Sequence, residues 1–169
     1  MKLLSRLAII AITLCLPLVT VSCTCAVGGA TVSLIPSLEE GRPGEHFEVG
    51  VQIEPGDQGV SAVEINLAFE PQAIQVVDVR PGALLGERPL PGMLEIDNEV
   101  GSLNYSLARV GETIAPTPDA VFAVIMFQIL EPANPGNYEL DLINIGLADE
   151  NFNDTKGIQL KDASIRVRP

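Results

Sequence analysis

A strict two-residue alternation of apolar and polar side chains is the feature that most constrains how this chain folds. Between residues 60 and 70, every odd position from 63 to 69 is a large apolar residue, and the even positions are polar or small. Successive side chains of a β-strand point to opposite faces, so this segment is predicted to be a strand with one buried face. Residues 47–54, 102–108 and 163–167 repeat the pattern. Residues 121–130 are apolar on both faces apart from Gln128, which predicts a central strand.

Proline and glycine are concentrated between these segments, where they predict turns. The turns are expected at residues 41–44, 55–57, 81–82, 91–92 and 132–136. No convincing amphipathic helix follows the N-terminal region. Eight or nine short strands at this spacing predict an all-β sandwich. The predicted domain covers residues 30–169, which is long enough to bury a core without metals or disulfides.

The alternation changes phase at two places, and each change predicts a β-bulge. Buried-face residues occupy even positions up to Leu142 and odd positions from Ile143 onwards. The same type of change separates Val76 from Val77. One extra residue in a strand produces such a shift and turns the strand that follows.

The N-terminus predicts export. Lys2 and Arg6 precede an apolar run at residues 7–21, which is shorter than the ~20 residues that a spanning helix needs and fits a signal peptide. Thr20-Val21-Ser22-Cys23 resembles a bacterial lipobox, which predicts lipidation of Cys23 and anchoring at the cell surface or envelope. The alternative is ordinary cleavage at a small-x-small site such as Gly28-x-Ala30 and release as a secreted protein. Residues 1–29 are therefore assigned to the leader and a short linker.

The charge of the chain bears on its partners. The whole chain has a net charge of −12, and the leader contains two of its ten basic residues and none of its 22 acidic ones. A surface this acidic disfavours nucleic acid and anionic lipid, and it suits a basic partner or a cation. The alternative is that the charge only keeps an exported protein in solution.

The sequence offers no catalytic motif. His46 is the only histidine, and its neighbours place it at the exposed start of a strand. No cysteine lies beyond Cys25, so the predicted domain has neither a thiol nucleophile nor a disulfide framework. The serine-hydrolase, zinc-protease and phosphate-loop patterns are all missing from the sequence. We therefore predict a binding module and not an enzyme.

One loop contains weak candidates for a calcium site. Asp149, Asn151 and Asn153 have the first-third-fifth spacing of an EF-hand loop. Asp154 stands where that loop needs glycine, and Leu160 stands where it needs a bidentate glutamate. An acidic connection between two strands is the simpler interpretation.

An ordered series of segments resembles the cohesin domain. Its parts are residues 32–36 (VSLIP), 43–47 (PGEHF), 63–71 (VEINLAFEP), 74–85 (IQVVDVRPGALL), 121–125 (VFAVI) and 146–149 (GLAD). The resemblance covers almost all of the chain after the leader. It implies a nine-stranded jelly-roll sandwich related to carbohydrate-binding modules. Cohesins typically bind a calcium-loaded dockerin and dock enzymes for polysaccharide breakdown.

The resemblance also implies a partner-binding face. In the family, this face includes the outward side of the strand that corresponds to residues 60–70, where Glu64 and Asn66 lie here. Cohesins have an Asn-x-Asp pair at the position of Ala62 and Glu64, so the acidic residue is kept in kind and the asparagine is lost. Asn104 and Ser106 are the candidates on the neighbouring strand. The expected partner is an exported protein such as a dockerin-bearing enzyme, and any calcium is expected in that partner and not in this chain.

Two other functions remain open on the sequence alone. Direct carbohydrate binding is compatible with a sandwich, but flat sugar-binding faces usually rely on exposed aromatic rings. The chain has no tryptophan and only two tyrosines, of which Tyr105 is predicted to point inward. A structural module of the cell envelope is the other alternative.

Overall fold

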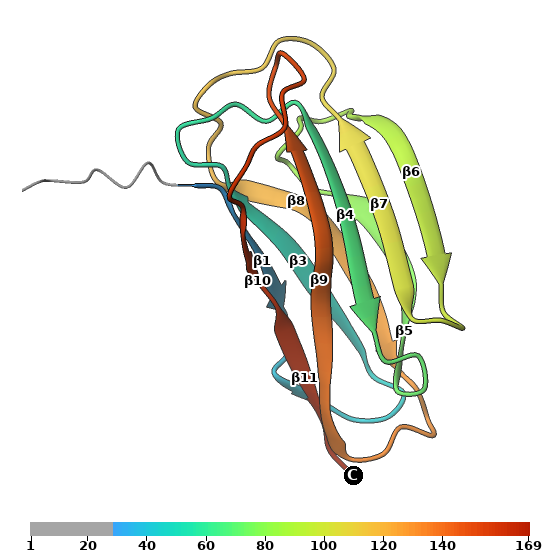
Figure 1. Ribbon diagram of the computed structural model, residues 1–169. Coiled ribbons are helices and arrows are strands. Elements are labelled where there is room, and N and C mark those ends of the chain that lie inside the picture. The colour runs from blue at the N-terminus through green and yellow to red at the C-terminus, as the bar shows by residue number, and fades with distance from the viewer. Residues whose placement is uncertain (1–28) are drawn as a thin grey trace, which may run out of the picture.

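In the computed structural model, which describes residues 29–169, the chain is an all-β sandwich of two sheets, as predicted (Figure 1). Every element in this range is a strand, and it contains no helix that could cross a membrane. The strands in chain order are β1 (Thr31–Pro36), β2 (Glu40–Gly41), β3 (His46–Glu54), β4 (Ala62–Phe69), β5 (Ile74–Pro81), β6 (Leu90–Asp97), β7 (Ser102–Ala108), β8 (Ala120–Ile129), β9 (Gly136–Ala148), β10 (Gln159–Lys161) and β11 (Ala163–Val167).

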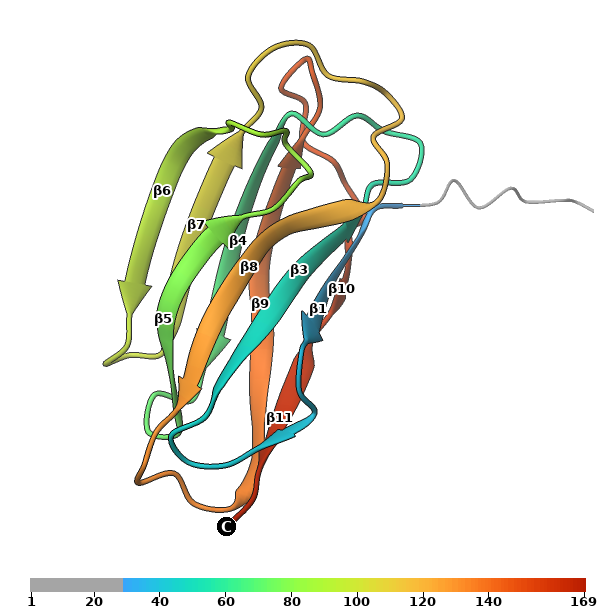
Figure 2. The same ribbon diagram turned by 180° about the vertical axis from the view of Figure 1, so that it is seen from behind.

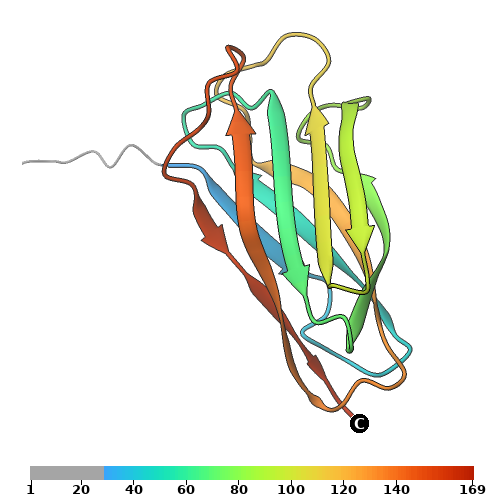
Figure 3. The ribbon, with the colours of Figure 1, turned by 45° about the vertical axis from the view of Figure 1, so that its right-hand side comes forward.

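One sheet has five strands in the order β10-β1-β3-β8-β5, and the other has six in the order β2-β11-β9-β4-β7-β6. Figure 2 shows the five-stranded sheet in front, and Figure 3 shows β9, β4, β7 and β6 side by side in front. The described residues form eleven strands, of which nine have five or more residues, in agreement with the nine-stranded sandwich that the resemblance implies. The excess comes from short pieces such as β2 and β10, which pair in parallel with β11 and β1 and are too short for a periodic pattern.

The core lies between the two sheets and is filled by the residues that the alternation assigned to the buried face. Val63, Ile65, Leu67 and Phe69 of β4 are all buried, and the odd-numbered residues of β7 lie buried beside them. Phe127 of β8 stacks on a ring of β3 at 5.4 Å and meets the Phe69 ring edge-on at 5.6 Å. Aromatic pairs at such distances add to the stabilisation from burial itself. Strand β8 pairs with β3 on one side and β5 on the other, which confirms the predicted central strand.

Both predicted β-bulges are present. In the β4–β9 ladder, Asn66 pairs with Asn144 and Leu67 pairs with Leu142, so Ile143 is the extra residue. In the β5–β8 ladder, the register shifts across Val77. Ile143 is consequently 64% exposed, while Leu142 before it and Leu147 after it stay buried.

One predicted turn is wrong. Pro91 and Gly92 lie within β6, at an irregularity of its pairing with β7. Strand β6 is the edge of the six-stranded sheet, and a proline is tolerated there because no further strand needs its missing N–H group. Gly92 lies so close to β7 that a Cβ atom would come within 2.4 Å of the Ser106 Oγ. Glycine is therefore required here by close approach and not by a turn.

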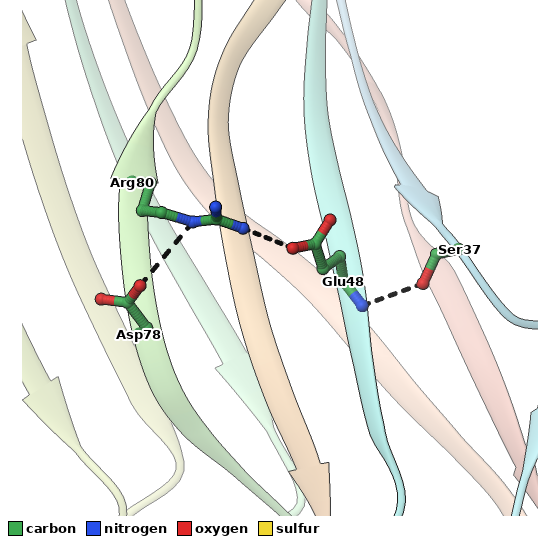
Figure 4. A network of polar contacts seen from close by, with 4 residues as sticks. All are labelled: Ser37, Glu48, Asp78 and Arg80. Carbon is green, nitrogen blue, oxygen red and sulfur yellow. Dashed lines mark hydrogen bonds and ion pairs between the residues drawn. The ribbon is translucent and has the colours of Figure 1, made fainter.

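The outer face of the five-stranded sheet contains a network of polar contacts (Figure 4). The Arg80 guanidinium of β5 reaches across β8 to the Glu48 carboxylate of β3, and its Nε lies 3.7 Å from the Asp78 carboxylate. The Glu48 N–H donates a hydrogen bond of 2.9 Å to the Ser37 Oγ. The charge of Arg80 is thus paired with acidic neighbours.

Candidate functional site

The outer face of the six-stranded sheet brings together the four residues that the sequence selected for partner binding. Glu64 and Asn66 lie on β4, and in the β4–β7 register they stand directly opposite Ser106 and Asn104. All four are outside the core, because the buried face of each strand is taken by its odd-numbered residues. Their placement together is confirmed, and their role in binding is a prediction.

A polar row crosses this face from strand to strand. Asn144 of β9 is in register with Asn66 of β4, which is in register with Asn104 of β7 and then Glu95 of β6. The Asn66 side-chain amide donates to the Asn104 Oδ1, and the Asn104 amide donates to the Glu95 Oε2 at 3.3 Å. Linked amides and a carboxylate on a flat sheet can both donate to and accept from a partner.

A hollow of about 330 Å³ lies beside this row, and we call it the face hollow. It exists because adjacent register positions hold residues with little or no side chain: Ala62 of β4 faces Ala108 of β7 and Ala148 of β9, and Gly146 of β9 faces Glu64. Glu64, Ser106 and Asp154 supply its polar groups, and the hollow also contacts Leu90 and Pro91 of β6.

Strand β6 is anchored at the edge of the face hollow. The Met93 N–H donates a hydrogen bond of 2.7 Å to the Ser106 Oγ, which fixes the irregular part of β6 against β7. The sequence did not predict that β6 borders the hollow, because Pro91 and Gly92 were expected to form a turn. The signal that was available is the series of alanine and glycine residues on the outward side of β4, β7 and β9.

The charged residues on the four strands that the polar row crosses are all acidic. Strands β4, β6, β7 and β9 contain no lysine, arginine or histidine, whereas they contain the acidic residues Glu64, Glu95, Asp97, Glu139 and Asp141. Within residues 29–169, every ion pair involves Arg80, Arg166 or Arg168, none of which lies on these strands. We call the outer side of β9, β4, β7 and β6 the acidic face. Such a surface attracts cationic groups and speeds their association.

The calcium candidates lie in the loop after β9, next to this face. The Asp149 Oδ1 accepts hydrogen bonds from the N–H groups of Asn151 at 2.8 Å and Asn153 at 2.9 Å, and its Oδ2 accepts one from the Asn153 side-chain amide at 3.0 Å. The bond from the Asn153 side chain is the main cause that lowers the pKa of the Asp149 carboxyl, and the backbone bonds from Asn153 and Asn151 add to it. Asp149 therefore organises its own loop. No group of three or more acidic, histidine or cysteine side chains in the described range is placed to hold a metal ion, and Asp149, Asn151 and Asn153 remain only the weak calcium candidates of the sequence.

The aromatic residues offer no flat platform for sugars in the described part of the chain. Tyr105 is 6% exposed and points inward, as predicted, and the Tyr138 hydroxyl donates to the Asn134 carbonyl at 2.7 Å. Phe152 is the one aromatic ring that is largely exposed there, and it lies on a loop and not on a sheet. His46 is exposed at the start of β3, as expected. The predicted leader and Cys23 lie outside the described residues.

Comparisons with known proteins agree with this geometry. A family model, described as the cohesin domain, matches residues 32–167. Among solved structures, the chain is similar to a non-cellulosomal cohesin from the archaeon Archaeoglobus fulgidus, with 18% identity, a TM-score of 0.68, and coverage of 84% of this chain and 93% of that one. It is also similar to the third ScaC cohesin of Acetivibrio cellulolyticus in complex with the ScaB dockerin, with 19% identity, a TM-score of 0.69, and coverage of 83% and 99%.

A further similar structure is the OlpA cohesin of Clostridium thermocellum in complex with a dockerin, with 17% identity, a TM-score of 0.65, and coverage of 82% and 99%. No curated protein sequence matches the chain. The structural likenesses establish the fold, and the family model assigns nearly the whole described sandwich to one family.

Proposed function

The chain belongs to the cohesin family, and from this premise we propose that it is a non-catalytic receptor that docks a dockerin-type module of another exported protein. The acidic face is the proposed docking surface. The similar ScaC and OlpA cohesins are both in complex with dockerins, which supports the partner class.

The observation that carries the proposal is the combination of features on the acidic face. It joins a hydrogen-bonding row, a hollow with small residues at its base, and acidic groups that no basic residue of the same strands neutralises. The outer face of the five-stranded sheet differs, because its Arg80 is already paired with Glu48 and Asp78. A partner with basic and hydrogen-bonding side chains therefore gains more by docking on the acidic face.

The face departs from the cohesin pattern in a way that bears on specificity. Ala62 takes the place of the family's asparagine and contributes to the face hollow, while Glu64 takes the place of the aspartate and reaches one methylene further. We propose that the partner fills the hollow with a side chain at the place where the family pattern has asparagine. Glu64 is the proposed centre of the polar contacts.

The location of the protein is part of the proposal. The leader and Cys23 support export and lipid anchoring at the cell surface, with secretion as the alternative. A receptor held there would retain a dockerin-bearing enzyme close to the cell during polysaccharide breakdown. Calcium in this scheme belongs to the partner.

Calorimetric titration tests the proposal directly. Residues 29–169, which contain every strand of both sheets, are titrated with calcium-loaded dockerin modules, and the titration is repeated with a chelator. We expect calcium-dependent binding that Glu64→Ala weakens by about 1.5–3 kcal/mol, the range for hydrogen bonds to charged groups. Glu54→Ala is the matched control, because Glu54 is an exposed acid at the end of β3 in the other sheet. Equal losses in the two variants, or no binding by the unaltered protein, would contradict the proposal.

A further inference from the structure

Three loops meet at the end of the sandwich that borders the face hollow. They connect β3 to β4, β7 to β8, and β9 to β10, and Figure 1 shows them together at the top. Side chains tie them to one another: the Thr155 hydroxyl donates to the Gln58 side-chain carbonyl at 3.0 Å, and the Val60 N–H donates to the Thr117 Oγ1 at 2.9 Å. Thr117 is buried, so this second bond is shielded from water. The loops therefore form one supported surface.

A second hollow, of about 410 Å³, lies among these loops, and we call it the end hollow. Phe152 and Glu150 line it from the loop after β9, and Arg109 and Glu112 line it from the loop after β7. Ala108 lines both hollows, so the end hollow continues the face hollow past the end of β7. A partner element that crosses the acidic face can reach both.

Phe152 is the unusual residue of the end hollow. Its side chain is 81% exposed, and its φ of 60° makes it the one non-glycine residue in the left-handed region within residues 29–169. A bulky residue in that region is strained, and the surrounding structure has to hold it there. Asp149 does so: its carbonyl accepts the Phe152 N–H at 3.1 Å, and its carboxylate binds the N–H groups of the residues on either side. The loop thus holds an apolar ring in solvent, with no packing inside the domain to account for it.

The charges around the ring favour a cation. Glu112 and Glu150 form no ion pair in the described range. Arg109, which also lines the end hollow, is directed to backbone carbonyls: its Nη2 donates to the Leu84 carbonyl at 2.6 Å and its Nε to the Val60 carbonyl at 3.3 Å. An aromatic face beside two carboxylates attracts a guanidinium or ammonium group.

We infer that the end hollow binds an arginine or lysine side chain of the partner, with its aliphatic stem on the Phe152 ring and its charge between Glu112 and Glu150. The inference rests on the proposed function, since the partner is the dockerin-type module that docks on the acidic face. Long basic side chains cover apolar surface with their stems while the charged head stays in contact with water, which suits this open site. Because the loop is already fixed by Asp149, little ordering is needed when the partner binds.

Calorimetry with a calcium-loaded dockerin module tests this inference. Phe152→Ala is expected to weaken binding about two- to fivefold, the factor that corresponds to an exposed cation–π contact. Phe152→Leu keeps an apolar side chain and removes the ring, so it is expected to show most of the same loss. Glu150→Gln is expected to weaken binding and to reduce its dependence on salt. Ile35→Ala is the control, because Ile35 is an exposed apolar residue on the five-stranded sheet.

The outcomes separate this inference from the proposed function. Wild-type affinity in Phe152→Ala, together with a loss in Glu64→Ala, overturns the inference and leaves the acidic face as the docking surface. If Phe152→Leu binds with wild-type affinity, the aromatic ring is not needed. That result overturns the claim that the partner residue is cationic and favours an apolar one. Absence of any calcium-dependent binding by the unaltered protein overturns both. Support requires, in addition, that replacing one arginine or lysine of the dockerin by alanine removes the effect of Phe152→Ala in a double-mutant cycle.

Discussion

Gly146→Leu is predicted to block partner binding without harming the fold. Gly146 lies on β9 and lines the face hollow. A Cβ atom there would meet only the Glu64 Cβ, at 3.6 Å, which is ordinary van der Waals contact, and the backbone at this residue does not need glycine. Replacing such a glycine with a larger residue lowers the entropy of the unfolded chain, so we expect a free energy of unfolding that is unchanged or higher by about 0.4–1 kcal/mol.

The effect on binding follows from the size of the hollow. A leucine side chain would occupy part of the 330 Å³ that the partner is proposed to fill. Forcing extra methylene groups into a fitted space costs about 1–3 kcal/mol, which corresponds to a roughly 5- to 150-fold weaker affinity. Urea denaturation followed by circular dichroism measures the first quantity, and calorimetric titration with the dockerin module measures the second.

Gly50→Leu provides a matched control. Gly50 lies on β3 in the other sheet, its nearest neighbour to an added Cβ is the Ile35 carbonyl oxygen at 3.8 Å, and it too has no need of glycine. We expect this variant to bind like the unaltered protein. The reasoning is refuted if Gly146→Leu binds with full affinity, or if it unfolds more easily by more than 1 kcal/mol.

Two further predictions concern the fold and the loop after β9. Gly111 has a φ of 93° with open space around it, so Gly111→Ala should lower the free energy of unfolding by roughly 1–2 kcal/mol, the cost of the left-handed backbone alone. Gly101 has a φ of 82°, and an added Cβ there would also lie 2.1 Å from the Phe69 carbonyl oxygen. Gly101→Ala should therefore lower the free energy of unfolding by more than Gly111→Ala does. Equal losses in urea denaturation would contradict this. The hydrogen bonds that lower the pKa of Asp149 in the fold stabilise the protein above its unfolded value of 3.8, and this contribution is lost as the pH falls through the folded pKa. The stability difference between the unaltered protein and Asp149→Asn should therefore shrink below pH ~4, and a difference that stays constant from pH 7 to pH 2 would show that the charge of Asp149 has no such role.

The sequence was sufficient to predict those strands in which apolar and polar residues alternate. The period of two identified β4 and β7 and their buried faces, because each has one side in the core. The phase changes located the bulges at Ile143 and Val77 for the same reason. Strand β6 was missed because its residues are exposed on both sides at the sheet edge, so no burial pattern marks it.

The candidate site could be predicted only in part. The alternation alone placed Glu64 and Asn66, which occupy even-numbered positions, on the outer side of their strand. The register that sets Ala62 against Ala108 and Ala148 depends on long-range pairing, which no local pattern specifies, so the face hollow was not foreseen. The spacing of Asp149, Asn151 and Asn153 resembled part of a calcium loop, but the sequence did not show that the Asp149 carboxylate binds the loop's own N–H groups.

The most direct test of the central claim is a hydrogen–deuterium exchange footprint of residues 29–169 with and without a saturating calcium-loaded dockerin module. The account predicts slower exchange in β4, β6 and β7, in the end of β9 from Asn144 onward, and in the loop that contains Phe152, with no change in β3, β8 and β5. Slower exchange confined to the five-stranded sheet, or an unchanged pattern throughout, would contradict the assignment of the acidic face as the docking surface.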